Sequence, residues 1–329
     1  MLVFYCFSKK FFQKESIIES ATRLLSLCFI TITFVLLFIF NSANSFANYS
    51  DENSQKQIPE LDSSLAQFSN QYFLFTLTDD TEIIAKIDSV VKGTYYVKTQ
   101  IGLPITLSKD MIKDIKRLRG EFVEGKYIRF DPNRTRLFFA PTAKPLEGGE
   151  GYFSVCQIFF PMLTIGITNF IAISGGVSLF PGAQKQIFYG NLKIVPLKLN
   201  EFSFAVGGLV TSIPDEFSGG IIYGCGTWGT DNNSLTIGLG LPHEEWKTFK
   251  NPIILLGGDV RLSNSVKFIT ENWIFTEGEV EILFSFGLRF FGDYLAADFG
   301  FFSTKTLLEE PSGLPVWPWI GFAYNFGGK

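Results

Sequence analysis

The sequence predicts an all-β protein, in which an antiparallel up-and-down transmembrane β-barrel of about twelve strands follows a small β-barrel-like domain. Three observations support this prediction. The chain of 329 residues is rich in Phe (37) and Gly (31), and only 18% of its residues are charged, against about 25% in typical soluble domains. Apolar residues alternate with polar or small ones along most of its second half, which is the period of a β-strand. Short and longer connections alternate between these segments, as they do in barrels that cross a membrane.

The first 47 residues predict a signal peptide. An uncharged apolar run at 24–40 follows a basic region, and Ser45 and Ala47 supply the small residues that a signal peptidase needs, with cleavage before Asn48. A retained inner-membrane anchor is the alternative, because the run is only just long enough to span a bilayer. Residues 48–70 are polar and predict a flexible leader or a short helix.

Residues 71–119 predict a small β domain. Turn residues separate the β-branched and aromatic runs YFLFTLT, EIIAKIDSV, YYVKTQI, LPITLS and MIKDIKRL. In its polar turn, its basic-aromatic strand and its closing strand, this segment resembles small Sm-like or SH3-like barrels. That resemblance implies a binding or scaffolding module, with a plain periplasmic spacer as the alternative. Residues 120–133 are expected to form a linker.

Residues 134–329 predict the barrel itself. In 280–290 every even position is apolar, whereas the odd positions are mixed and include charged residues. The polar face carries small residues and charges of both signs, as expected inside a small closed barrel, whereas Lys and Glu would crowd the wet face of a soluble sandwich. An even number of strands puts both chain ends on the periplasmic side. The expected strands are 134–142, 151–166, 170–180, 186–197, 201–211, 219–229, 233–241, 252–262, 266–275, 279–291, 293–303 and 315–326.

Charged side chains on the expected lumen face are the candidate functional residues. One reading is a polar conduction path whose selectivity they tune. The other is a salt-bridged plug, because twelve strands lie near the boundary between a filled interior and a channel. Glycine pairs within the strands are expected to permit curvature or close packing. The candidates are Lys193, Asp259, Arg261, Lys267, Glu271, Glu279, Glu281, Arg289 and Asp298.

The end of the chain, WIGFAYNF, carries a second export feature. Gly321, Tyr324 and Phe326 have the spacing that outer-membrane insertion machinery reads. Trp319 departs from this pattern, since a polar residue is common there, and so does the tail 327–329. The blocks RTRLFFAPTAKPLEGGEGYF and YGCGTWGTDNNSLTIGLG resemble uncharacterised Gram-negative outer-membrane β-barrel proteins with a small N-terminal β domain. The resemblance implies a barrel in the outer membrane with its N-terminal domain in the periplasm, and it implies no activity.

No motif in the sequence indicates catalysis. The net charge of −4 and the lack of a Lys/Arg stripe exclude a nucleic-acid partner, and no Cys/His cluster suggests zinc. Cys156 and Cys225 are expected to be isolated small hydrophobes. The single histidine, His243, falls in an expected outer loop and is interpreted as an ordinary exposed residue. We therefore expect no cofactor, no metal and no enzymatic activity.

Three functions remain open from the sequence. The first is an outer-membrane barrel that forms a narrow pore for small polar solutes. The second is a non-conducting structural or envelope-binding barrel whose N-terminal β domain engages a periplasmic protein. An outer-membrane lipid-acting enzyme is a distant third. The expected partners are outer-membrane lipid, the outer-membrane insertion machinery and, as a further candidate, a periplasmic protein.

Overall fold

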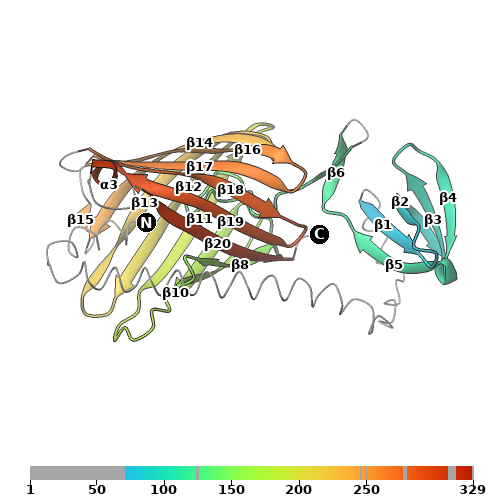
Figure 1. Ribbon diagram of the computed structural model, residues 1–329, viewed down its shortest axis with the longest axis horizontal. Helices are drawn as coiled ribbons and strands as arrows, with labels where there is room; N and C mark the ends of the chain where they lie inside the picture. The colour runs from blue at the N-terminus through green and yellow to red at the C-terminus, as the bar shows by residue number, and fades with distance from the viewer. Residues whose placement is uncertain are drawn as a thin grey trace.

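The computed structural model describes residues 71–123, 126–244, 247–248, 251–276, 280–309 and 316–327. The predicted signal peptide and polar leader lie outside these residues. The described chain forms a small β domain and a closed β-barrel (Figure 1). None of the helices among these residues is long and apolar enough to cross a membrane.

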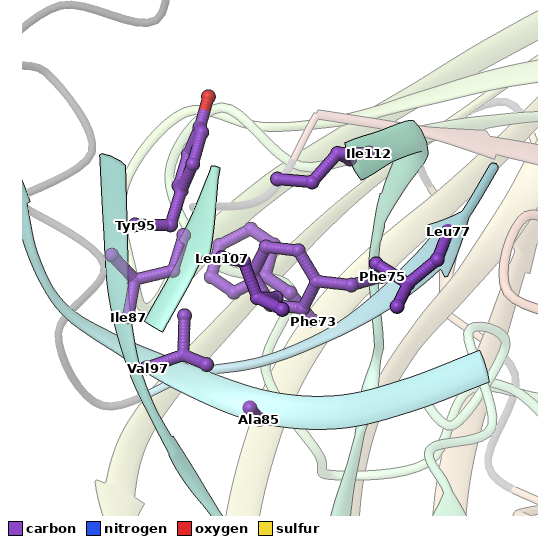
Figure 2. Close-up of a cluster of buried hydrophobic side chains, with 9 residues drawn as sticks. All are labelled: Phe73, Phe75, Leu77, Ala85, Ile87, Tyr95, Val97, Leu107 and Ile112. Atoms are coloured by element: carbon purple, nitrogen blue, oxygen red, sulfur yellow. The ribbon is translucent and has the colours of Figure 1, made fainter. Parts of the chain in front are cut away.

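The small domain is a five-stranded antiparallel sheet with the strand order β4-β3-β2-β1-β5. Alternation in the first strand turns Phe73, Phe75 and Leu77 to one face, where they join a core of side chains that are at most 7% exposed (Figure 2). Lys92 and Gly93 have positive φ angles (49° and 77°), as a tight hairpin turn between the second and third strands requires. The strands are β1 (Tyr72–Leu77), β2 (Glu82–Val91), β3 (Thr94–Thr99), β4 (Pro104–Ser108) and β5 (Ile112–Arg117), with a 3-10 turn at Lys109–Met111 between β4 and β5.

Twelve antiparallel strands form the barrel, and pairing of β13 with β14 closes the ring. The two-residue strand β15 (Lys247–Thr248) pairs antiparallel with the end of β14 and is not one of the twelve ring strands. The short helix α3 (Lys305–Glu309) follows β19 and precedes β20 in the chain. The ring strands are β8 (Gly151–Cys156), β9 (Phe160–Gly166), β10 (Ile171–Val177), β11 (Phe188–Lys198), β12 (Phe202–Ile213), β13 (Phe217–Gly229), β14 (Asn233–Glu244), β16 (Ile253–Ser263), β17 (Val266–Phe275), β18 (Glu281–Phe291), β19 (Leu295–Thr304) and β20 (Trp317–Phe326).

The predicted strand number is confirmed, but two of the individual assignments are wrong. The segment 151–166 is a hairpin of two strands, β8 and β9, because Gln157 and Ile158 adopt positive φ and turn the chain. The segment 134–142 is not a strand of the ring, since its one bridge, between Arg136 and Pro141, lies within the segment. These two differences cancel in the total.

The outside of the barrel is apolar. The alternation predicted for β18 is confirmed, since Ile282, Phe286 and Phe290 are exposed while Ser285 and Arg289 are buried. Aromatic side chains gather near the end of the barrel that has short turns, as they do at a membrane–water interface. These exposed aromatic residues are Phe170, Phe202, Trp228, Phe290, Tyr294 and Tyr324.

A two-stranded hairpin, β6 (Gly120–Val123) and β7 (Lys126–Arg129), occupies most of the expected linker and joins the small domain to the short-turn end of the barrel (Figure 1). The Arg129 guanidinium pairs with Asp293 (2.9 Å) and donates to Ser265 Oγ (2.7 Å). Lys116 of the small domain reaches the same Asp293 carboxylate (3.2 Å). Arg119 stacks on the Tyr294 ring, 4.6 Å from its centroid. Contacts to two barrel turns therefore hold this connection in place.

We predict that Phe75→Ala unfolds the small domain and leaves the barrel folded. Phe75 is 0% exposed at the centre of the cluster in Figure 2, and truncating a buried Phe costs about 3–5 kcal/mol. Limited proteolysis should cut the variant within 71–119, while the barrel keeps its heat-modifiable gel shift. The matched control is Tyr96→Ala, which removes a 44% exposed ring. Equal protease resistance of the two variants would contradict the prediction.

Candidate functional site in the barrel lumen

Residues 131–146 run through the inside of the barrel, and we call them the lumen segment. All of them are buried except Arg134, Phe139 and Pro141, which are partly buried. The middle of the segment folds back on itself, because Leu137 N–H donates to Ala140 O (2.9 Å). The segment is thus an irregular hairpin packed against the lumen face of the strands, where the sequence predicts a wall strand.

The Glu271 carboxylate, on the lumen face of β17, binds the tip of this hairpin. Its Oε2 accepts the consecutive backbone N–H groups of Phe139 (2.9 Å) and Ala140 (3.0 Å), and its Oε1 accepts Trp273 Nε1–H (2.8 Å). Glu271 is 0% exposed. Hydrogen bonds from N–H groups to a buried carboxylate are about twice as strong as neutral ones. The charge of Glu271 therefore caps backbone groups that have no strand partner.

Lys193 of β11 does the reverse and binds carbonyl groups of the lumen segment. Its ammonium group donates to the backbone oxygens of Thr135 (3.2 Å), Thr142 (3.2 Å) and Lys144 (2.9 Å). In β13, Thr227 Oγ1 accepts Ala143 N–H (2.8 Å). Side chains from several strands of the barrel thus bind the backbone of the lumen segment.

A buried ionic network forms the base of the hairpin. Arg289 donates to both carboxylate oxygens of Asp298 (2.6 and 3.1 Å), and Arg136 of the lumen segment pairs with the same Asp298 (2.9 Å). Lys267 contacts both Asp259 (2.8 Å) and Asp131 (3.3 Å). Asp131 is also 3.3 Å from Arg289, so one network joins three cations to three carboxylates. These residues are Arg136, Lys267 and Arg289, and Asp131, Asp259 and Asp298.

The position of Asp131 shows how this network is balanced. Burial alone would raise the pKa of Asp131, but Arg289 and Lys267 lower that pKa below its ordinary value. Asp131 is therefore a carboxylate at neutral pH, although it is 1% exposed. Arg289 also donates to the backbone oxygens of Asn133 (2.9 Å), Arg136 (3.1 Å) and Leu137 (2.5 Å), so the network fixes both charge and backbone.

Two lumen-facing glycines make room for the apolar tip of the hairpin. A Cβ atom at Gly257 would collide with Leu137, and one at Gly300 would lie 3.0 Å from the Phe138 ring. Phe138 also packs on Trp319, with ring centroids 6.0 Å apart. Trp319, which departs from the usual C-terminal pattern, thus faces the lumen and contacts the lumen segment.

The structure places the other predicted charges differently. Arg261 lies at the short-turn rim, where it donates to Asn232 Oδ1 (2.6 Å) and to the backbone oxygen of Arg129 (2.8 Å). Glu281 is partly buried at the start of β18, near the opposite end of the barrel, and Glu279 lies outside the described residues. Asp259, Lys267, Arg289 and Asp298 meet in the network, whereas Lys193 and Glu271 bind the lumen segment separately.

Asp131, Arg136 and Lys144 of the lumen segment are not among the residues predicted from the sequence. Lys144 donates to Thr230 O (2.6 Å) and lies 3.4 Å from Asp231. The signal that could have found them is the proline content, since Pro132, Pro141 and Pro145 fall within 131–146. Proline is rare inside the strands of a sheet.

A cavity of about 910 Å³, counting its opening to solvent, lies beside the lumen segment. Its walls are mostly apolar and include Leu209 and Trp273. Among the described residues that line it, Arg136 and Lys193 are the only charged ones, and Thr135, Asn191 and Tyr223 are among the polar ones. The lumen is therefore filled on one side and hollow on the other.

Two smaller expectations concern cysteine and histidine. Cys156 and Cys225 are both free and buried. His243 lies within β14, opposite Gly220 and Thr248, so its assignment to a loop is wrong. Within the described ranges, no group of three His, Cys, Asp or Glu residues is arranged to hold a metal ion.

Comparison with known proteins finds only distant structural similarity. No protein family matches the chain, and no curated protein matches it. Similar solved structures include a KdgM porin (14% identity, TM-score 0.42, 54% of this chain and 98% of the other). The NanC porin (8%, 0.38, 55% and 100%) and OprD of Pseudomonas aeruginosa (9%, 0.31, 78% and 93%) are further examples. Similarity at these values carries no inference about the function of this chain.

We predict that Lys267→Met destabilises the barrel strongly. Lys267 is 0% exposed between Asp131 and Asp259, and removing one partner of a buried ionic group costs about 3–5 kcal/mol. The folded, heat-modifiable band should disappear at a clearly lower urea concentration. The matched control is Lys185→Met, whose ion pairs with Asp215 and Glu216 are exposed and worth about 0–1 kcal/mol. Equal urea midpoints for the two variants would contradict a stabilising network.

Proposed function

We propose that this protein is a Gram-negative outer-membrane barrel that is closed in its resting state and that holds its small β domain at the periplasmic face. In this proposal the barrel anchors the domain, and the domain engages a periplasmic protein. The observation that carries the proposal is the lumen segment, which is bound by Glu271 of β17, Lys193 of β11 and Arg289 of β18.

Residence in the outer membrane is supported by the two faces of the barrel. Charged side chains such as Lys267 and Asp298 face inward, while large apolar side chains face outward. A wet exterior would not favour such an arrangement, whereas lipid does. The exposed aromatic residues near the short turns mark one interface. We also propose that the chain is exported and assembled by the outer-membrane insertion machinery. No catalytic role is part of this proposal.

Closure of the lumen is supported by burial and by hydrogen bonding. Leu137, Phe138 and Ala140 are at most 1% exposed and pack against Leu255, Ile269 and Trp319 from the walls. The backbone of the segment is held by charged groups that would be left buried and unpaired if it moved away. The same contacts argue against a conduction path through this side of the lumen.

A narrow pore for small polar solutes is the second candidate. The cavity beside the lumen segment favours it, because a channel on that side would need less rearrangement than one through the packed side. Its mostly apolar walls are a poor match to polar solutes.

Cell fractionation tests the location. We expect the full chain in the outer-membrane fraction, with a heat-modifiable shift on gels. Leu256→Arg places a charge on the apolar exterior, where Leu256 is 43% exposed, and should reduce assembly because an outward Arg costs about 2–4 kcal/mol near the bilayer midplane. Recovery of the unmodified chain in the soluble periplasm would overturn the assignment.

Planar-bilayer recording tests closure. The purified wild-type barrel should show no channel steps. Replacing residues 135–142 with a Gly/Ser segment of equal length should produce steps, because the side chains that fill the lumen are removed. The matched control is the same kind of replacement at 181–184, which is exposed in an outer connection. Steps from the wild type, or none from a folded 135–142 variant, would contradict the proposal.

A further inference from the structure

The cavity beside the lumen segment lies toward the end of the barrel that has the longer connections. Ile253, which lines it, is the first residue of β16 after one of these connections, and Trp273 lies close to the end of β17 before another. Phe139 and Pro141 of the lumen segment also line the cavity. The buried ionic network lies nearer the short turns, where Lys267 is close to the start of β17. Entry of a ligand from the longer-connection end therefore leaves the network undisturbed.

The charged residues of the lining have no free charge to offer a ligand. The Lys193 ammonium group is taken up by three backbone oxygens of the lumen segment. Arg136 pairs with Asp298, and its Nε and Nη2 are themselves buried. A charged ligand would lose its hydration without gaining a partner, which is costly. The lining therefore favours an uncharged ligand.

The polar atoms of two aromatic lining residues are also bound within the protein. Trp273 Nε1–H donates to Glu271 Oε1 (2.8 Å), and Tyr223 O–H donates to Asn191 Oδ1 (3.0 Å). Indole and phenol rings combine a large apolar surface with one polar atom. Because that atom has a partner in both residues, these rings offer a ligand mainly their carbon surface.

Apolar side chains in this part of the lumen keep open surface. Leu209, Tyr223 and Trp273 face inward and line the cavity, yet each is only partly buried. Their neighbours Val210 and Ile222 point outward and are 50% and 60% exposed, where lipid covers them in the proposed location. Contact of inward apolar surface with water is unfavourable. A ligand that covers this surface is therefore stabilised.

We propose that this cavity binds a small uncharged aromatic molecule, with its ring against Leu209, Tyr223 and Trp273. Aromatic rings favour edge-to-face or offset contacts with one another, and ligand cavities typically combine apolar and aromatic walls with a few polar groups. The site goes beyond the proposed anchoring function, since a closed barrel can hold a ligand beside its lumen segment. The aromatic side chains of the lining are Phe139, Tyr152, Tyr223 and Trp273.

Fluorine NMR with the full-length protein in detergent tests the site, with para-fluorobenzyl alcohol as the probe and empty micelles as the blank. We expect a protein-dependent change of the fluorine shift that saturates. Para-fluorobenzoate and para-fluorobenzylammonium keep the ring but carry a charge, and each should bind at least about tenfold more weakly. Cyclohexylmethanol, which lacks the aromatic ring, should compete about threefold more weakly than benzyl alcohol.

Two pairs of variants locate the binding within the barrel. Leu209→Trp in β12 and Met162→Trp in β9 fill the cavity from two strands, and each should abolish saturable binding. The matched controls are Val210→Trp and Leu163→Trp, which place the same ring at outward positions that are 50% and 44% exposed. Both controls should bind the probe as the wild type does. The heat-modifiable gel shift shows that each variant is folded.

Absence of saturable binding to the wild type would mean that the cavity holds only water and would overturn the proposal. A charged analogue that binds as tightly as the alcohol would also overturn it, and so would binding that a folded cavity-filling variant retains. Equal competition by cyclohexylmethanol would contradict the aromatic preference. Fractionation and planar-bilayer recording report on the proposed function separately, so failure of the ligand site is distinguishable from failure of that function.

Discussion

The backbone of the lumen segment depends on the barrel wall for its hydrogen bonds. Buried N–H and C=O groups need partners, and an irregular segment inside a closed ring cannot take them from a neighbouring strand. Glu271 supplies an acceptor for two N–H groups, while Lys193 and Arg289 each supply donors for three carbonyl groups. The charged side chains in the lumen therefore bind the backbone of the lumen segment as well as one another.

This dependence explains the composition of the lumen face. Side chains that bind the segment are long and charged, whereas positions that its tip occupies are glycine, as at Gly257 beneath Leu137 and Gly300 beneath Phe138. At any one height along the barrel axis, the lumen of a twelve-stranded ring has room for large wall side chains or for a segment of chain, but not for both. Where the lumen segment packs against the strands, the facing strand positions are small residues. Glycine at these positions leaves room for the side chains of the segment.

Period-2 alternation predicted the strands, because it depends only on the difference between the two faces of a sheet. The composition of the polar face and the lengths of the connections then predicted a barrel and not a sandwich. Alternation also identified the exterior of β18 and the inward direction of Lys267, Arg289 and Asp298. The assignment of 134–142 to a wall strand was wrong, because residues 137–141 are apolar without alternation and the stretch is buried or partly buried on both sides. Alternation reports a difference between two environments, and a segment enclosed on all sides has no such difference. Which charges pair also depends on strand register, which a sequence without the fold does not specify; Arg289 lies opposite Asp298 only because β18 and β19 pair as they do.

The connection between the two domains supports the proposed anchor over the alternative proposal of a pore. Arg129 pairs with Asp293 at the barrel rim, and Asp131, two residues later, enters the buried network through Lys267 and Arg289. The stretch that positions the small domain is therefore continuous with the stretch that fills the lumen. A force on the domain would first meet the rim contacts of Lys116 and Arg119, whose side chains are at least partly open to solvent. It would then meet the buried contacts of Asp131, which are far costlier to break. Withdrawing the lumen segment would require breaking both the rim contacts and the buried contacts. The contacts that keep the lumen filled therefore also keep the small domain attached to the barrel.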